Sequence, residues 1–133
     1  MKKTNLEINN LTKDRIDKKL LEKIAKKTLK SLKTKLAEIS LVFVSDIRMK
    51  SLNRKYRGRN RVTDVLAFDY GEIIICLPQA KRQAKKINHS LRKELAILLI
   101  HGILHLAGYG DETKKGYNKM ANKQKEIWQK IIQ

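Results

Sequence analysis

The sequence contains a single cysteine, Cys76, among its 133 residues. One thiol cannot form an intramolecular disulfide or a four-thiolate zinc site, which excludes both within one chain. Cys76 lies in the apolar run GEIIICLP, where we expect a buried, inert thiol. The first ten residues, MKKTNLEINN, have no apolar stretch behind their basic residues, so we expect no signal peptide. Together these features predict a soluble protein of the reducing cytoplasm.

Long hydrophobic runs and chain breaks are also scarce. The longest apolar run, residues 95–107, is too short to cross a membrane and contains His101 and His105. Pro78 is the only proline, and no repeat or linker divides the chain. Because 41% of the residues are hydrophobic, the composition is that of a folded protein. We expect residues 1–133 to form one domain around one core.

Acidic residues are few, and this absence predicts the class of partner. The 13 acidic residues stand against 31 basic residues, which gives a formal net charge of +18. A positive field of this size favours a polyanionic partner, such as nucleic acid or an anionic membrane face. The alternative is codon bias, which produces lysine-rich solvated surfaces with no binding role.

Hydrophobic periodicity predicts an α+β fold, with about four strands in one sheet covered by about five helices. We expect strands at residues 5–9, 39–45, 64–68 and 72–77, the first at an edge and the last two as a hairpin. We expect helices at residues 13–35, 49–57, 78–87, 91–107 and from 112 onward. Ser45 or Asp46 can cap the second helix, while Gly58 and Gly108 end the second and fourth helices.

The segment HGILHLAGYGDE, residues 101–112, predicts a metal site. His101 and His105 are one helical turn apart and about 40° from a common face, so both imidazoles can reach one ion. Gly108 breaks the helix, and the next two residues can fold back so that Asp111 supplies an oxygen ligand. Three protein ligands leave a position open for water, which is typical of catalytic zinc. We expect one Zn²⁺, or another divalent first-row metal.

An ordinary pair of histidines on an apolar helix is the alternative to a metal site. Two imidazoles in an otherwise apolar segment need polar partners, and a carboxylate close after the glycine break favours ligation. The helix is like that of zinc proteases, in which a glutamate after the first histidine acts as general base. Gly102 occupies this position here, which argues against a peptidase.

A second segment, RMKSLNRKYRGRNRVTDVLAF, contains five of the eight arginines and no acid before Asp64. An arginine fork binds phosphate through two parallel hydrogen bonds, which lysine cannot form, so codon bias does not explain this segment. The alternative is a solvated turn. Tyr56 could stack on a base or fill a core position, and the role of Asp64 stays open. The residues that we expect to bind RNA are Arg54, Arg57, Arg59 and Arg61.

In these two segments the sequence resembles the YbeY family of single-domain, metal-dependent endoribonucleases that act in ribosomal RNA maturation. The resemblance rests on LNRKYRGRNRVTDVLAF, the following GEIIIC and HGILHLAGYGDE, with Met120 and Glu126 downstream. It implies a metal held by His101, His105 and position 111, and an arginine at Arg57 that is important for activity and contacts RNA phosphate.

The chain departs from the family pattern at position 111, which is normally a third histidine and is Asp111 here. Aspartate is a competent zinc ligand, but its negative charge should make the ion a weaker Lewis acid. His89 is the only other histidine, and we do not expect it to replace the missing ligand.

These expectations combine into one hypothesis for the whole chain. It is a metal-dependent endoribonuclease for single-stranded RNA in ribosomal RNA maturation and ribosome quality control, with water activated by the metal and Arg57 as catalytic residue. The expected partners are ribosomal RNA and a ribosomal subunit or its proteins, with no membrane and no specificity for DNA. The alternative, motivated by Gly110 and Asp111, is an RNA- or ribosome-binding accessory factor with a weak or vestigial metal site. The sequence identifies no general base.

Overall fold

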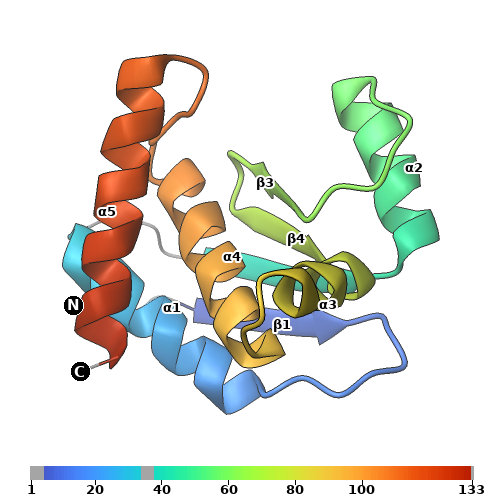
Figure 1. The fold of residues 1–133 in the computed structure, drawn as a ribbon, viewed down its shortest axis with the longest axis horizontal. Coiled ribbons are helices and arrows are strands. Elements are labelled where there is room, and N and C mark those ends of the chain that lie inside the picture. The colour runs from blue at the N-terminus through green and yellow to red at the C-terminus, as the bar shows by residue number, and fades with distance from the viewer. Residues whose placement is uncertain (1–4, 34–37, 133) are drawn as a thin grey trace.

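The computed structural model describes residues 5–33 and 38–132, with side chains up to residue 131. It confirms the α+β fold, in which helices cover a single mixed sheet (Figure 1). The strands are β1 (Asn5–Asn10), β2 (Glu38–Val44), β3 (Val65–Phe68) and β4 (Glu72–Cys76). The helices are α1 (Lys18–Leu32), α2 (Asp46–Arg57), α3 (Leu77–Lys86), α4 (Leu91–Leu106) and α5 (Lys114–Ile132).

The sheet has the strand order β1-β2-β4-β3, so β1 is an edge strand, as predicted, and β3 is the other edge. β1, β2 and β4 are parallel, with Leu41 of β2 opposite Ile73 of β4. β3 and β4 form the predicted antiparallel hairpin. The short β3 therefore leaves one side of its backbone without a strand partner among the described residues.

The two faces of the sheet carry different apolar cores. Leu41 and Phe43 of β2 belong to the larger core, which α1, α4 and α5 cover. Val44 belongs to a smaller core on the opposite face, where Met49 of α2 packs. This separation follows from the alternation of side chains along a strand. It places α2 in a different layer from α4, as Figure 1 shows.

Helix boundaries differ from the predicted ones where capping decides them. α1 begins at Lys18 rather than residue 13, because the Asp17 carboxylate accepts a hydrogen bond from the Leu20 N–H at 3.1 Å. The predicted end of this helix, residue 35, lies outside the described residues. Ser45, not Asp46, caps α2, and Gly58 ends it in the left-handed conformation with φ 68°. α5 begins at Lys114 instead of residue 112.

Helix α4 is the most buried of the helices within the described residues. It packs against α1, α3, α5, β3 and β4, and its interior residues are almost all buried. Gly102 faces the sheet so closely that a Cβ atom there would lie 2.8 Å from Cγ2 of Ile73. Within the described ranges, no helix is both long and apolar enough to span a bilayer.

We expect Gly102→Ala to destabilise the protein by up to about 2 kcal/mol. The added methyl group overpacks the contact with Ile73, at about 1–3 kcal/mol, while the better helix propensity of alanine returns about 1 kcal/mol. Urea unfolding followed by circular dichroism measures the free energy of unfolding. The control is the same substitution in an Ile73→Ala background, where the clash is absent and Gly102→Ala should cause no loss. An equal loss in both backgrounds would contradict the contact as the cause.

Candidate metal centre and arginine-lined cleft

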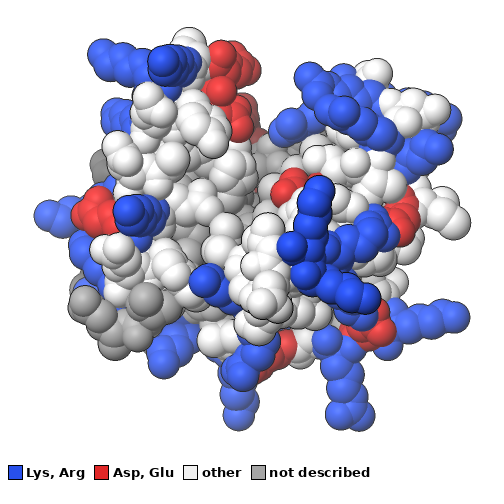
Figure 2. Space-filling view, viewed as in Figure 1, with Lys and Arg blue, Asp and Glu red and all other residues white. Residues whose placement is uncertain are grey.

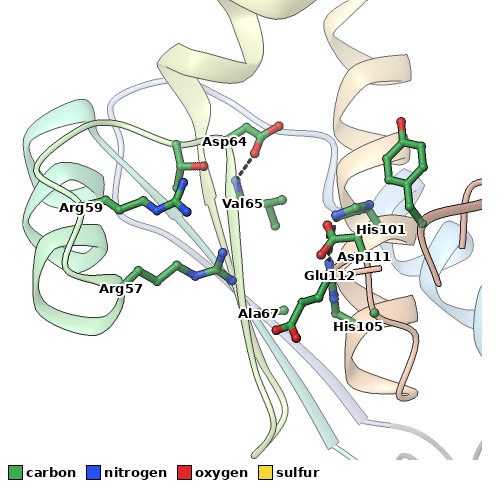
Figure 3. A pocket seen from close by; sticks show the side chains of 12 residues that line it. Arg57, Arg59, Asp64, Val65, Ala67, His101, His105, Asp111 and Glu112 are labelled. Carbon is green, nitrogen blue, oxygen red and sulfur yellow. Dashed lines mark hydrogen bonds and ion pairs between the residues drawn. The ribbon is translucent and has the colours of Figure 1, made fainter. Parts of the chain in front are cut away.

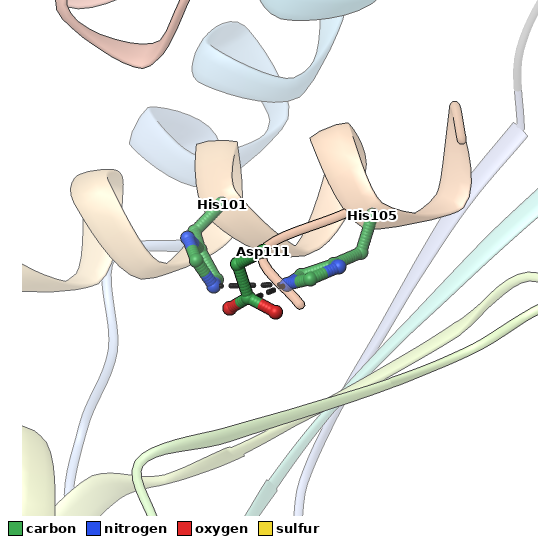
Figure 4. Close-up of side chains that lie close together, drawn as sticks. All are labelled: His101, His105 and Asp111. Carbon is green, nitrogen blue, oxygen red and sulfur yellow. Dashed lines mark hydrogen bonds and ion pairs between the residues drawn. The ribbon is translucent and has the colours of Figure 1, made fainter. Parts of the chain in front are cut away.

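His101 and His105 face the same space from the last two turns of α4. Their Nε2 atoms are 3.1 Å apart and their rings meet edge to face, with centroids 4.6 Å apart. Each side chain is partly exposed in an otherwise buried part of the helix. The two imidazoles are thus polar side chains in an otherwise apolar segment, as the sequence predicted, and they point into one opening (Figure 4).

The turn after α4 brings Asp111 to the two imidazoles. Gly108 has φ 98°, a conformation that glycine adopts without steric cost, and the Tyr109 N–H donates to the Leu104 carbonyl at 3.0 Å. The chain then reverses, and Oδ2 of Asp111 lies 3.9 Å from Nε2 of His105 (Figure 4).

The three side chains fit a metal ion in distance and in chemistry. One ligand atom from each of His101, His105 and Asp111 lies within 4.8 Å of the others. Ligand atoms on a tetrahedral zinc ion, with bonds of about 2.0–2.2 Å, are separated by about 3.3–3.6 Å, so a small adjustment would bring all three onto one ion. Two imidazole nitrogens and a carboxylate oxygen suit zinc and its first-row neighbours.

Electrostatics around His105 favour the neutral imidazole. Burial lowers the pKa of His105, the neighbouring His101 lowers it further, and the Asp111 carboxylate opposes these effects. Arg57, on the other side of the opening, also lowers this pKa. A neutral ring keeps the lone pair that a metal requires, so the surroundings of His105 favour the ligating form.

Gln124 of α5 orients the His101 ring through Nδ1, the ring nitrogen that does not face His105. Its side-chain oxygen lies 3.3 Å from Nδ1 of His101, and its amide nitrogen donates to the Ile97 carbonyl at 3.5 Å. This arrangement makes Nδ1 the donor and leaves Nε2 free to bind a metal. Sequence reasoning missed Gln124. The available signal was a polar residue on the inward side of α5, between the buried Met120 and Ile127.

An open cleft of about 940 Å³ joins this cluster to the arginine segment. One wall is the end of α2 and the segment that follows it, together with β3, and the other is the end of α4 with the turn into α5 (Figure 3). Figure 2 shows a hollow between these two sides, with blue basic atoms gathered over the α2 side and red acidic atoms facing them. The lining residues include Arg57, Arg59, Thr63, Asp64, Ala67, His101, His105, Asp111, Glu112 and Tyr117.

The four predicted RNA-binding arginines divide into two pairs. Arg57 and Arg59 line the cleft, and Figure 3 shows Arg57 pointing across it toward His105. Arg54 and Arg61 are not among the lining residues, although both are exposed nearby. Among the described residues, none of the four guanidinium groups forms an ion pair. Their charges are therefore available to a phosphate.

Buried Asn53 fixes the arginine segment to α2. Its side-chain amide donates to the Arg61 carbonyl at 2.9 Å, and its own carbonyl accepts a hydrogen bond from the Arg59 N–H at 3.4 Å. Only 2% of Asn53 is exposed, so these bonds lie largely out of water. Sequence reasoning passed over this residue, whose signal was an asparagine on the inward side of a basic helix.

Asp64, whose role the sequence left open, is held in place directly before the first residue of β3. Its carboxylate accepts hydrogen bonds from the Val65 N–H at 2.8 Å and from the Gln83 amide at 3.3 Å. The same Gln83 nitrogen donates to buried Glu94 at 2.7 Å, and Glu94 contacts Nε2 of His89 at 2.7 Å. His89 thus has a carboxylate partner of its own and lies outside the cluster, as the sequence predicted.

The remaining predicted residues have simple positions. Met120 is buried and lines a small cavity beside His101, whereas Glu126 pairs with Lys123 and Lys130 on the outer side of α5.

Cys76 is fully buried, and burial raises its thiol pKa to about 11, so the thiol is inert as expected. Glu112, which sequence reasoning did not single out, lines the cleft.

Comparisons with known proteins match nearly all of this fold. A family model described as endoribonuclease YbeY matches residues 7–132. The chain is 39% identical over 128 residues to an endoribonuclease YbeY of a Sulfurihydrogenibium species, with 87% of this chain and 84% of the relative covered. An endoribonuclease YbeY of Thermotoga maritima is 38% identical over 123 residues, with 83% and 82% covered.

A solved structure has the same fold. The solution structure of TM1509 from Thermotoga maritima superposes with a TM-score of 0.63 at 33% identity, covering 94% of this chain and 90% of that one. The matched residues include α4 with its two histidines and the whole arginine segment. The chain therefore belongs to the endoribonuclease YbeY family.

Proposed function

We propose that the chain, as one domain of residues 1–133, is a metal-dependent endoribonuclease that cleaves single-stranded RNA. The observation that supports this most strongly is the cleft itself, in which Arg57 faces the cluster of His101, His105 and Asp111. The relatives named endoribonuclease YbeY support RNA as the substrate, as does the net charge of +18. Ribosomal RNA in the cytoplasm is the proposed target, in maturation and quality control, with a ribosomal subunit or its proteins as partners.

His101, His105 and Asp111 would hold one ion, with Zn²⁺ as the proposed metal. A bound metal supplies a Lewis acid that activates water and offsets negative charge at phosphorus. Gln124 accepts a hydrogen bond from Nδ1 of His101, and burial lowers the pKa of His105, which favours its neutral form. Both imidazoles are therefore prepared for ligation by the surrounding protein.

Arg57 is the proposed catalytic residue because its guanidinium reaches into the cleft opposite the cluster (Figure 3). A phosphate between the two walls would receive paired hydrogen bonds from Arg57 and, as negative charge grows in the transition state, stronger ones. Arg59 would hold the same backbone, whereas Arg54 and Arg61 would bind phosphates outside the cleft. Asn53 supports this geometry by fixing the segment that carries Arg59 and Arg61.

We expect the purified protein to bind about one Zn²⁺ per chain and His101→Ala or Asp111→Ala to weaken binding at least about 100-fold. Loss of one ligand of three should cost more than loss of a supporting hydrogen bond, which costs about 10- to 100-fold in affinity. Isothermal titration calorimetry measures the affinity, and Co²⁺ substitution reports the ligand geometry. The matched control, His89→Gln, should bind as tightly as the original chain. Unchanged binding in His101→Ala would contradict the site.

We expect Arg57→Ala to slow cleavage of single-stranded RNA about 10- to 100-fold, the effect of losing charge-assisted hydrogen bonds worth about 1.5–3 kcal/mol. The rate is followed on a labelled oligonucleotide by gel electrophoresis, with Zn²⁺ present. Arg57→Lys should recover only part of the rate, because lysine cannot form the paired bonds.

The control for Arg57→Ala is Arg48→Ala, which removes the same charge from the first turn of α2, outside the cleft lining, and should leave the rate unchanged. Both variants should retain metal. If the original chain binds RNA without metal and never cleaves it, the protein is an RNA-binding accessory factor instead. If RNA binding fails to weaken as salt rises, the phosphate contacts themselves are wrong.

A further inference from the structure

Three aromatic side chains gather on the surface beside the cleft. The chain has only one Trp, four Tyr and two Phe, so aromatic residues are scarce. Tyr56 lies in the last turn of α2, Phe68 ends β3, and Tyr70 lies in the turn between β3 and β4. We call these three residues the aromatic ledge.

The rings of the aromatic ledge contact one another in a chain. Phe68 and Tyr70 are stacked, with centroids 5.6 Å apart and planes 16° apart, and Tyr56 meets Phe68 edge to face at 5.1 Å. Phe68 packs against the smaller apolar core, which anchors the group. The Tyr70 hydroxyl donates to the Glu72 carboxylate at 2.9 Å and so restrains the outermost ring. The ledge is therefore an ordered group of rings.

Two of these rings are open to solvent, which aromatic side chains usually avoid. Tyr56 is 52% exposed and Tyr70 is 75% exposed. An internal packing role explains Phe68, but it does not explain large exposed rings on either side of it. Tyr56 thus does not fill the core position that was one of its two predicted roles.

The charge around the ledge favours a polyanion. The ammonium group of Lys55 lies 5.2 Å from the centroid of Tyr56, and Arg54 and Arg57 share the same last turn of α2. The hairpin side contributes the acids Asp69 and Glu72, so the basic charge lies on the α2 side alone. Exposed rings beside a basic groove are how proteins bind unpaired nucleotides, with phosphates on the charges and bases on the rings.

The ledge is continuous with the cleft across the edge strand β3. Ala67 lines the cleft, and the next residue along the strand, Phe68, points to the opposite face of the sheet. Tyr56 likewise directly precedes Arg57, which lines the cleft. A single strand with one phosphate at Arg57 would therefore reach the ledge by crossing β3.

From this arrangement we propose that the aromatic ledge is a base-stacking subsite for unpaired nucleotides of an RNA strand whose phosphate is bound in the cleft. The inference rests on the proposed function, because it assigns the part of the RNA that lies beyond the cleavage site. Stacking needs a free base face, which nucleotides inside a duplex do not offer. The ledge would therefore select single-stranded RNA over duplex RNA.

The test compares two probes that differ only in their bases. One is a labelled single-stranded oligouridine, and the other has the same length and phosphate number but abasic residues. Binding to the full chain is measured by fluorescence anisotropy, with EDTA present to prevent cleavage. We expect Tyr56→Leu and Tyr70→Leu each to weaken oligouridine binding about fivefold or more, since stacking on one ring contributes at least roughly that much. Binding to the abasic probe should not change.

Conservative variants separate stacking from a structural role. Tyr56→Phe and Tyr70→Phe keep the rings and should retain oligouridine binding, whereas Arg57→Ala should weaken binding to both probes. Melting temperatures confirm that the leucine variants remain folded. If leucine variants bind oligouridine normally, or lose both probes equally, the subsite is wrong while the proposed function stands. If the original chain binds neither probe, both fail. If it binds both probes equally tightly, the ledge does not stack on bases.

Discussion

The close approach of α4 to the sheet at Gly102 is the constraint on which the candidate site depends. A helix turns about 100° per residue, so fixing Gly102 against Ile73 also fixes the directions of His101 and His105. A side chain at position 102 would require either the Ile73 side chain or α4 itself to shift. Gly102 occupies the position at which zinc proteases have a glutamate as general base. The same glycine allows α4, the helix with the two histidines, to pack closely against β4. The absence of a side chain at position 102 thus determines both the packing of α4 and the lack of a protease-type general base.

The site joins two layers of the fold that the edge strand β3 separates. The histidines come from α4, on one face of the sheet, and the arginines come from the end of α2 and the segment after it, where α2 covers the other face. Asn53 anchors the arginine side, and Gln124 anchors the histidine side. Because each anchor is hydrogen-bonded to the wall that it holds, Gln124 to His101 and Asn53 to the arginine segment, the two walls are positioned before any substrate binds. β3 then sets the distance between them.

Sequence reasoning succeeded where neighbouring residues decide the outcome. The apolar periodicity gave the helices and strands, and Gly58 and Gly108 adopt the left-handed conformation that ends a helix. It failed where a contact joins distant residues. The hydrogen bonds of Gln124 and the parallel register of β1, β2 and β4 depend on tertiary packing, which no local pattern encodes. The four arginines likewise looked equivalent, because the tertiary placement of the end of α2 and of the turn at Gly58 decides which ones line the cleft.

Asp111 changes how charge would be divided within the cleft. A carboxylate ligand makes the net charge of the ion together with its ligands one unit lower than a histidine would. The site should therefore attract phosphate less strongly. Arg57 and Arg59 have no ion pairs among the described residues, so no acidic partner offsets the positive charge that they bring to the cleft. In the proposed site, phosphate binding would therefore depend more on the arginine wall than it would with three imidazoles. The metal would then serve mainly to activate water, and the arginines to hold the strand.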